Sequence, residues 1–342
     1  MSDSSGPADA GVRRQLNSLM LGNFVTQIIY AAAKLGIPDI LAAGPRSSDQ
    51  LAQETGSNHS ALRTELRALA ALDILSEDER GFYALRPMGE LLKSFPGLRS
   101  QAILTGEEYF KSSAELIHTI KTGTPAFDHA MGGSFYEYFA KHPDTASRFN
   151  EVMAASATAR YAEIPTLYDF SRVTPFVDVG GGYGGLTAII LEAYPCARAI
   201  LFDAPHVIAR ARKFIEERGL AARCDIVEGS FFESVPAGGA AYLLSSVVCN
   251  WDDERAGKIL RNCRTAMSRR GSELVLVEPA FLSEKAPSAN AAILAVAGYA
   301  IQGSIVRTES EYRSILELAG FEFKSIRALA YEPYAMIHAV PR

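Results

Sequence analysis

The sequence lacks several features that would assign it to a common class of protein. Its four cysteines form no CxxC pair, and we expect free thiols in a cytoplasmic protein. No run of about 18 uncharged apolar residues is present, so no segment is expected to span a membrane. The N-terminal MSDSSGPADAG is polar and small, without the basic and apolar regions of a signal peptide.

An excess of basic charge is also absent. The net charge of −5 and the pI near 5.8 give the molecule no general attraction to nucleic acid or to anionic membranes. The chain does have length and apolar content, with 342 residues of which 48% are hydrophobic. These values predict a large core and two domains of ordinary size.

Residues 1–100 predict a winged-helix arrangement. After a disordered tail over residues 1–12, the apolar spacing over 15–35 predicts one or two helices. Ser47 and Gln50 are spaced as a capping box for a helix over 48–54, and Asn58 or Ser60 can cap the next helix. Two short strands joined by a charged turn ending in Gly81 follow.

A winged helix can bind DNA or serve as a dimerisation module. Residues 1–100 carry ten Lys and Arg against eleven Asp and Glu, and the turn SEDER is mostly acidic. A DNA-binding domain needs a basic face that neutralises phosphates. We therefore expect a dimerisation domain that binds no nucleic acid, with a winged-helix regulator as the disfavoured alternative.

The remaining residues, 101–342, are expected to form the second domain. Residues 101–170 predict helices that cover a pocket. From residue 171 strands and helices alternate, as in FVDVG, LTAIILEAYP, AILFDA and VIARARKFIEERG. Such alternation predicts an α/β, Rossmann-like doubly wound and mostly parallel sheet. The final segments FEFKSIRAL and YAMIHAV are expected to close its edge as a hairpin.

The segment FVDVGGGYGG, residues 176–185, is the strongest candidate for a ligand site. A strand leads into a glycine-rich turn and then a helix, and Gly180, Gly182 and Gly185 also match the GxGxxG spacing of NAD sites. Asp203 ends the next strand, 21 residues after Gly182, where a carboxylate can bind ribose hydroxyls. Both NAD and S-adenosylmethionine carry such a ribose, and Asp203 could alternatively cap the helix that follows. After the third strand, Phe231 or Phe232 can stack on adenine or pack in the core.

The chain resembles the S-adenosylmethionine-dependent small-molecule O-methyltransferases, the family of plant caffeate-type and bacterial polyketide-tailoring enzymes. The resemblance covers most of the chain, and these segments carry it: LGIPDIL, SSDQLAQETG, LRALAALDIL, RFNEVMAASA, FVDVGGGYGG, LFDAPHVI, EGSFFESVP, NWDDERAGKILRNCRTAM and RTESEYRSILELAGF. It favours S-adenosylmethionine over NAD as the cofactor. Together with the apolar N-terminal helices, it also implies a homodimer.

The resemblance also implies roles for individual residues. Gly180 and Gly182 would lie under the methionine part of the cofactor, Asp203 would bind the ribose and Phe231 would face the adenine. The other implied cofactor residues are Met153, Ser156, Ser230 and Ser245. Ser230 replaces an Asp that many members use to meet the adenine amine, so that hydrogen bond loses charge assistance.

The catalytic histidine of the family is missing. Many members read His-Asp-Trp-Asp-Asp-Glu after the fourth strand, where this chain has Cys249-Asn250-Trp251-Asp252-Asp253-Glu254. Anthracycline-tailoring relatives and phenazine N-methyltransferases also lack it. Cys249 and Asn250 occupy the catalytic positions, with Cys249 either a base or inert pocket lining. His118 or His129 could stand in as a base, whereas His206 in DAPHVI is expected to be structural.

The acidic run after Trp251 has two interpretations. Asn250, Asp252 and Asp253 could ligate Mg²⁺, but acids that open a helix are typically caps that favour its dipole. We expect capping and no metal.

We therefore expect methylation of an oxygen or nitrogen on an aromatic, polyketide-like molecule in secondary metabolism or antibiotic biosynthesis. Positioning would replace the histidine base, because orientation alone can supply roughly 7–11 kcal/mol. The alternative is that S-adenosylmethionine assists hydroxylation, decarboxylation or a pericyclic step without giving up its methyl group. The predicted pocket aromatics are Tyr109, Trp251 and Tyr299, with Phe110 and Tyr136 as further candidates.

Overall fold

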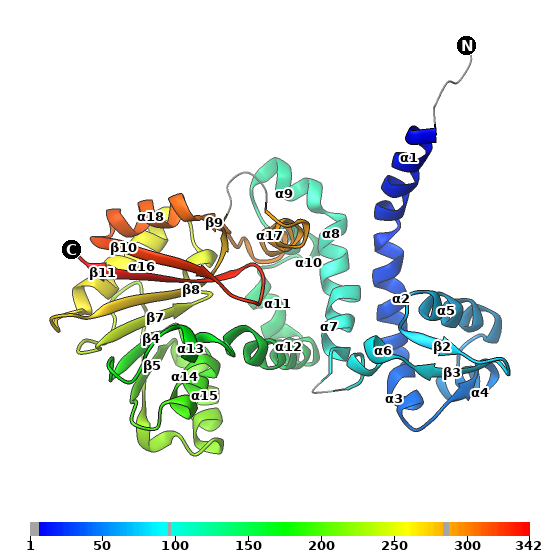
Figure 1. The fold of residues 1–342 in the computed structure, drawn as a ribbon, viewed down its shortest axis with the longest axis horizontal. Coiled ribbons are helices and arrows are strands. Elements are labelled where there is room, and N and C mark those ends of the chain that lie inside the picture. The colour runs from blue at the N-terminus through cyan, green and yellow to red at the C-terminus, as the bar shows by residue number, and fades with distance from the viewer. Residues whose placement is uncertain (1–6, 95–96, 283–286) are drawn as a thin grey trace, which may run out of the picture. The chain divides into compact units, whose positions relative to one another are not determined.

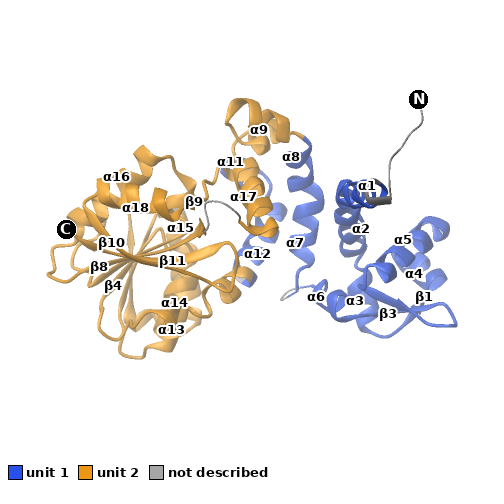
Figure 2. Cartoon of the chain, turned by 45° about the horizontal axis from the view of Figure 1, so that its top comes forward, with its two compact units in different colours: residues 1–114, 136–155 blue, residues 115–135, 156–342 orange. Residues whose placement is uncertain are grey.

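The computed structural model describes residues 7–94, 97–282 and 287–342 (Figure 1). The chain forms two compact units, residues 1–114 with 136–155 and residues 115–135 with 156–342 (Figure 2). Each unit has its own core, and the two are described separately below. None of the helices in the described part of the chain combines the length and hydropathy needed to cross a bilayer.

The first unit begins with the predicted winged helix. Its elements are α1 (Pro7–Met20), α2 (Gly22–Leu35), α3 (Ile37–Ala42), β1 (Arg46–Ser47), α4 (Ser48–Thr55), α5 (His59–Ala71), β2 (Leu75–Glu77) and β3 (Phe82–Leu85). Ser47 and Gln50 form the expected capping box, and Asn58 caps α5 by accepting a hydrogen bond from the Ala61 amide. The strands form a sheet in the order β1-β3-β2. The winged-helix prediction is therefore confirmed.

The predicted tail is shorter than expected. Residues 1–6 lie outside the described residues, but residues 7–12 belong to α1 and are not a disordered segment. Pro7 begins this helix, a position that proline tolerates because the first amides have no intrahelical partner. The prediction of disorder over residues 7–12 was therefore wrong.

The first unit extends beyond residue 100, where we placed the domain boundary. It continues with α6 (Pro87–Leu91), α7 (Arg99–Leu104), the π-helix η1 (Thr105–Tyr109) and α8 (Phe110–Ala114), and later takes in most of α11 (Phe135–Lys141) and of α12 (Pro143–Tyr161). Gln27 donates to the Gly106 carbonyl at 3.0 Å, and Tyr30 donates to Glu107 at 2.9 Å. These bonds tie η1 to α2. They explain why residues 101–114 belong to the first unit, although the predicted boundary was at residue 100.

The second unit is built on the predicted sheet. Its strands are β4 (Phe176–Val179), β5 (Ala199–Asp203), β6 (Cys224–Glu228), β7 (Ala241–Ser245), β8 (Glu273–Phe281), β9 (Arg307–Thr308), β10 (Phe321–Ala328) and β11 (Tyr334–Pro341). The order is β10-β11-β8-β7-β4-β5-β6, with β9 paired to β8. Strands β4 to β8 pair in parallel, and the antiparallel β10–β11 hairpin closes one edge as predicted.

Helices cover both faces of this sheet (Figure 1). One face packs α16 (Asp253–Ala266) and α18 (Glu309–Leu318) into a core, and the other packs α14 (Gly185–Ala193) and α15 (Pro205–Glu217) into a second core. The unit also holds α9 (Leu116–Thr122), α10 (Ala126–Met131), α13 (Ile164–Leu167), the short 3-10 helices η2 (Ala221–Arg223) and η3 (Val248–Asn250), and α17 (Ala289–Gln302), which we did not predict. This layering confirms the Rossmann-like fold class.

Candidate cofactor and acceptor site

The glycine-rich turn connects β4 to α14. Gly180, Gly182 and Gly184 have φ angles of 70°, 59° and 88°, in the left-handed region that favours glycine. The Gly180 amide donates to the Phe202 carbonyl at 2.8 Å, which anchors the turn to β5. The turn therefore lies at the carboxyl ends of β4 and β5, the edge at which open α/β sheets bind ligands.

Asp203, the last residue of β5, holds this turn. One carboxylate oxygen accepts from the Gly182 amide at 2.7 Å, and the other accepts from the Ala204 amide at 2.6 Å. The N-cap of α15 is Ala204, which makes no side-chain capping bond, so the alternative of Asp203 as a helix cap was wrong. Each carboxylate oxygen has a second lone pair, so Asp203 can still accept from two ribose hydroxyls.

Asp178 lies beneath the turn with only 1% of its surface exposed. The Thr187 hydroxyl donates to its Oδ2 at 2.6 Å, whereas Oδ1 has no hydrogen-bond partner among the described residues. Burial raises the pKa of this carboxyl from 3.8 to about 6, and the charge of Asp203 adds to the shift. A carboxyl that titrates near neutral pH therefore supports the floor of the turn.

We expect Asp178 to make the fold less stable as the pH rises. Its folded-state pKa is raised, so its contribution is complete below pH about 4 and is lost as the pH passes through about 6. The difference of about two pKa units corresponds to about 3 kcal/mol. Asp178→Asn removes this titration. Urea unfolding should show the variant gaining about 3 kcal/mol relative to wild type between pH 4 and 7.5. A difference that stays constant over this range would contradict the assignment.

Aromatic side chains group around the residue predicted to face adenine. The ring centroids of Phe231 and Phe232 are 5.0 Å apart, and the Trp251 ring lies 4.7 Å from that of Phe232. Trp251 thus groups with the predicted adenine residues, whereas we had placed it in the acceptor pocket. Ser230 accepts from the Phe232 amide at 3.3 Å, which shapes the turn after β6.

The geometry of the glycine turn fits a ligand lying against it. A Cβ added to Gly182 would meet no atom within 4 Å, so the space above this residue is open. A Cβ added to Gly180 would come within 2.8 Å of Val247 and 3.5 Å of the Phe231 ring. The open space over Gly182, whose amide binds the Asp203 carboxylate, and the Phe231 ring near Gly180 together suit an adenosyl group.

The two glycines should respond differently to alanine. We expect Gly182→Ala to fold with a cost of about 1–2 kcal/mol for its left-handed φ, but to bind S-adenosylhomocysteine at least about 10-fold more weakly, because its methyl group enters the open space. Gly180→Ala should lose more stability, because its methyl group also overlaps Val247. Thermal unfolding and calorimetric titration measure the two effects. Equal stability of the two variants, or unchanged binding by Gly182→Ala, would refute this prediction.

Two serines end β7 beside the turn. Ser245 donates to the Tyr161 hydroxyl at 2.8 Å, so it contacts α12. Ser246 has a φ of 55°, unusual for a residue with a side chain, and its hydroxyl lies 2.9 Å from the Tyr334 hydroxyl. Strand β7 ends at Ser245, because the left-handed backbone of Ser246 cannot continue an extended strand.

Glu278 fixes the backbone where the family carries its histidine. This residue of β8 is completely buried, and its carboxylate accepts from the amides of Val247 at 2.8 Å, Val248 at 2.9 Å and Cys249 at 3.2 Å. Burial raises the pKa of the Glu278 carboxyl. One side chain therefore satisfies three successive amides of the loop 247–251.

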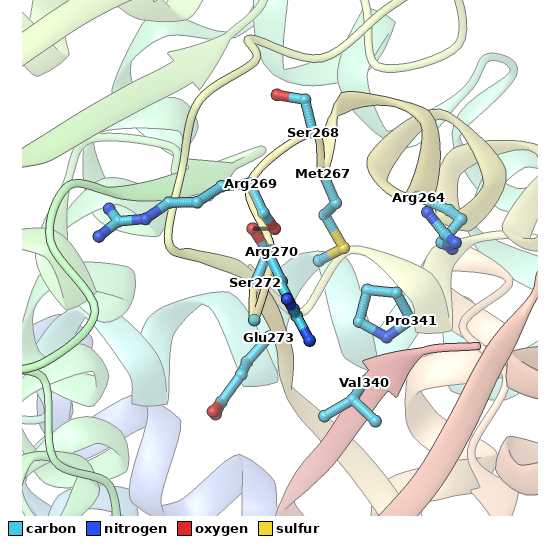
Figure 3. A pocket seen from close by; sticks show the side chains of 10 residues that line it. Arg264, Met267, Ser268, Arg269, Arg270, Ser272, Glu273, Val340 and Pro341 are labelled. Atoms are coloured by element: carbon cyan, nitrogen blue, oxygen red, sulfur yellow. Dashed lines mark hydrogen bonds between the residues drawn. The ribbon is translucent and has the colours of Figure 1, made fainter.

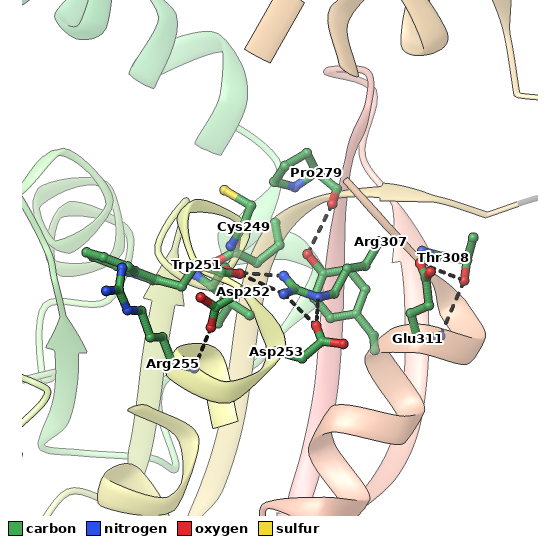
Figure 4. A network of polar contacts seen from close by, with 12 residues as sticks. Cys249, Trp251, Asp252, Asp253, Arg255, Pro279, Arg307, Thr308 and Glu311 are labelled. Atoms are coloured by element: carbon green, nitrogen blue, oxygen red, sulfur yellow. Dashed lines mark hydrogen bonds and ion pairs between the residues drawn. The ribbon is translucent and has the colours of Figure 1, made fainter. Parts of the chain in front are cut away.

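Arg307 and Asn250 also hold this loop, and Figure 4 shows the contacts of Arg307. The Arg307 guanidinium, 1% exposed, donates to the carbonyls of Val248 and Trp251 at 3.1 and 2.7 Å and pairs with Asp253 at 2.8 Å. Asn250 donates to the Ser246 carbonyl at 2.8 Å and accepts from Ser304 at 3.1 Å. The Asn250 side chain therefore serves mainly to hold the loop.

The Cys249 thiol is an unfavourable base. Burial and the nearby Glu278 raise its pKa well above the ordinary value, and the thiol points to the Asn250 amide oxygen at 3.6 Å. A neutral, buried thiol is neither a good nucleophile nor a good proton acceptor. The geometry favours inert pocket lining.

The other titratable candidates lie elsewhere. The rings of His118 and His129 stack at 4.1 Å. His118 is half-buried beside Thr124, and the exposed His129 lies 3.8 Å from Glu115. The side chain of His206 lies outside the described residues. Asp252 caps α16 by accepting from the Arg255 amide at 2.8 Å, which confirms the capping interpretation of the acidic run.

The remaining predicted residues are distributed over both units. Tyr109 and Met153 belong to the first unit, each partly buried, and burial raises the pKa of the Tyr109 phenol. Ser156 belongs to the second unit, where its neighbour Ala157 lies 3.4 Å from a Cβ built on Gly185. Tyr299 on α17 donates to the Gly123 carbonyl at 3.2 Å. Their functional roles stay predictions.

Sequence reasoning missed Glu278 and Arg307. A signal was available for Glu278, the only charge between Glu273 and Leu282 in ELVLVEPAF, because a charge within a buried apolar strand requires partners. Arg307 begins RTESE, a segment that also contains the Thr308 capping box. No neighbouring residue in the sequence distinguishes Arg307 from an ordinary surface arginine.

A surface pocket of about 370 Å³ has Glu273, Val340 and Pro341 in its lining (Figure 3). It includes Glu273, the first residue of β8, and so opens at the amino end of that strand. Two of its arginines already bind backbone carbonyls: Arg264 that of Arg342 and Arg269 that of Thr174. We assign the cofactor site to the opposite, carboxyl edge.

Two family models match the chain. One described as an O-methyltransferase domain matches residues 113–322, and one described as an O-methyltransferase dimerisation domain matches residues 17–94. The chain is 38% identical over 313 residues to a phenazine O-methyltransferase of Lysobacter antibioticus, covering 91% of each chain. It is 38% identical to a 3-amino-4-hydroxybenzoate 4-O-methyltransferase of Streptomyces cremeus, covering 99% of this chain and 92% of the relative.

Similar relatives include an N-methyltransferase. The phenazine-1-carboxylate N-methyltransferase of Pseudomonas aeruginosa is 33% identical, with 95% of this chain and 97% of the relative covered. Among solved structures, the mitomycin 7-O-methyltransferase matches with a TM-score of 0.90 at 30% identity, over 98% of this chain and 99% of that one.

A further solved structure, an O-methyltransferase of neocarzinostatin biosynthesis in complex with S-adenosylmethionine and 2-hydroxy-5-methyl naphthoic acid, matches with a TM-score of 0.80 at 27% identity. The match covers 93% of this chain and 96% of that one. The predicted enzyme class and its cofactor, S-adenosylmethionine, are thereby confirmed. The chain belongs to the O-methyltransferase family and carries the dimerisation domain of that family.

Proposed function

We propose that this enzyme methylates an oxygen or nitrogen atom of an aromatic small molecule in secondary metabolism. The observation that carries the proposal is the glycine turn held by Asp203, next to a rigid loop that has Cys249 in the place of a base. The named relatives methylate hydroxyl groups and a nitrogen of aromatic natural products, as their names state. S-adenosylmethionine supplies a methyl group on a positively charged sulfur, which a nearby nucleophile can accept.

The residues around the turn would hold the cofactor. We assign the ribose to Asp203, the space beneath the methionine part to Gly180 and Gly182, and the adenine to Phe231. Met153, Ser156, Ser230 and Ser245 stay further candidates. The contacts of Asp203 and Phe231 support this assignment, because Asp203 accepts from the Gly182 amide and the Phe231 ring lies 3.5 Å from a Cβ built on Gly180.

The acceptor would react by positioning. Neither the raised thiol pKa of Cys249 nor the amide of Asn250 favours proton removal. A phenol with a pKa near 10 can lose its proton to water, and an aromatic ring nitrogen needs no base. Holding such a nucleophile in line with the methyl group can supply roughly 7–11 kcal/mol, more than the typical gain from a general base.

We also propose that the enzyme is a homodimer. Large apolar side chains on and between α1 and α2 are more than half exposed in the single chain: Val12, Leu16, Leu19, Met20, Leu21 and Phe24. A stripe of this kind normally needs a partner. A monomer mass by analytical ultracentrifugation would contradict the dimer. The cytoplasmic location and the absence of nucleic-acid binding stay predictions.

Methyl transfer can be tested directly. The purified enzyme is incubated with methyl-labelled S-adenosylmethionine and either 3-amino-4-hydroxybenzoate or phenazine-1-carboxylate. We expect label in at least one acceptor and an equal amount of S-adenosylhomocysteine. No S-adenosylhomocysteine from any member of a broad panel of phenols and N-heterocycles would contradict the proposal. The missing histidine favours one second candidate function, in which the cofactor assists other chemistry without transferring its methyl group. That function predicts a product that forms without consumption of S-adenosylmethionine.

A further inference from the structure

Arg160, near the end of α12, is enclosed by tyrosines. Its guanidinium carbon lies 4.5 Å from the ring centroid of Tyr334, 5.5 Å from that of Tyr331 and 5.8 Å from that of Tyr161. Nη1 donates to the Ser246 hydroxyl at 3.3 Å, and the buried Nε has no hydrogen-bond partner in the described part of the chain. The site therefore places a positively charged guanidinium among three aromatic rings.

No carboxylate neutralises this guanidinium within the described residues 7–94, 97–282 and 287–342. Arg307, a buried arginine of the same unit, by contrast pairs with Asp253 at 2.8 Å. Glu163, three residues along the chain, accepts from the Ala330 amide, and Glu278 accepts from the loop 247–251. Arg160 is partly buried, and a guanidinium shielded from much of the solvent without a counter-ion is unusual. An anionic ligand can supply the missing negative charge.

Arg160 lies at the edge where the cofactor site was assigned. Its partner Ser246 directly follows β7, and Tyr334 pairs in register with Pro279 near the carboxyl end of β8. Val247, one residue beyond Ser246, approaches Gly180 so closely that a Cβ there would be only 2.8 Å away. The guanidinium is thus on the same edge as the glycine turn.

We propose that Arg160 binds a carboxylate of a bound small molecule, and this inference rests on the proposed function. A guanidinium presents a planar fork that matches a carboxylate with two parallel hydrogen bonds, and the stacked rings keep that fork oriented. The carboxylate has two possible sources: the methionine part of the cofactor, or an acid group on the aromatic acceptor. Arg160 is therefore a binding and positioning residue.

Ligand binding distinguishes the sources without any turnover. Calorimetric titration compares S-adenosylhomocysteine, which carries the carboxylate, with 5′-methylthioadenosine, which lacks it. If the cofactor is the source, Arg160→Met should weaken the binding of S-adenosylhomocysteine about 10- to 100-fold. The affinity for 5′-methylthioadenosine should stay within about 2-fold of wild type. Arg160→Lys should restore part of the loss, since it keeps the charge without the fork.

The second arm titrates phenazine-1-carboxylate against its neutral carboxamide. If the acceptor is the source, Arg160→Met should weaken the binding of the acid but not of the amide. The affinity for S-adenosylhomocysteine should then be unchanged. Arg218→Met, which removes an exposed pair with Glu192, is the matched control, and circular dichroism verifies folding. Equal binding of all four ligands by wild type and Arg160→Met would overturn the inference. Wild-type enzyme that does not bind S-adenosylhomocysteine would instead refute the proposed function.

Discussion

Glu278→Ala is expected to lower the free energy of unfolding by about 5 kcal/mol and to abolish methyl transfer. The substitution leaves three amides, those of Val247, Val248 and Cys249, without their acceptor in a buried loop. Each buried donor that loses its partner costs about 1–3 kcal/mol, and the cavity adds to the loss. Urea unfolding monitored by circular dichroism measures the change.

Two further variants make this result interpretable. Glu278→Gln keeps one acceptor oxygen and should lose less stability than Glu278→Ala. Glu322→Ala removes an exposed glutamate of β10 that pairs with Lys324, and it should stay within about 0.5 kcal/mol of wild type. A Glu278→Ala protein as stable as Glu322→Ala would show that this carboxylate does not hold the loop.

Asp203→Ala is expected to weaken the binding of S-adenosylhomocysteine by roughly 1000-fold. The side chain would bind two ribose hydroxyls, and hydrogen bonds to a charged group contribute about 1.5–3 kcal/mol each. The variant also frees the Gly182 amide, which Asp203 holds at 2.7 Å, so the turn would lose its preformed shape. Calorimetric titration gives the dissociation constant.

The neighbouring strand provides the control. Glu228 ends β6 in register with Asp203 and is exposed, so Glu228→Ala should leave the affinity within about 2-fold. Asp203→Asn should be intermediate, because it keeps an acceptor oxygen without the charge. If Asp203→Ala and Glu228→Ala bound equally well, Asp203 would not be the ribose ligand.

Local sequence patterns were sufficient for the elements that position the cofactor. The strand FVDV, its glycine turn and Asp203 lie within 28 residues and follow rules that depend on neighbours along the chain. The capping boxes at Ser47 and Thr308 are local in the same sense. The resemblance then identified the cofactor as S-adenosylmethionine, whereas the glycine turn alone was also compatible with NAD.

The acceptor side depended on contacts between distant residues. Glu278 lies 31 residues from Val247, and Arg307 lies 59 residues from Val248, so no local pattern joins them to the loop they hold. Ser246, whose backbone is left-handed, has its hydroxyl beside that of Tyr334, 88 residues further along the chain. The tyrosines around Arg160 come from two segments about 170 residues apart, which only the folded chain brings together.

The pH dependence of methyl transfer tests the central claim, that positioning replaces a base. kcat/KM is measured from pH 5 to 10 for two phenol acceptors whose own pKa values differ by at least about two units. Without an enzymatic base, the phenolate is the reacting form, so the midpoint of each profile should follow the pKa of that phenol. A rise at one common pH near 6.5 for both phenols would instead reveal a histidine-like base and contradict the account.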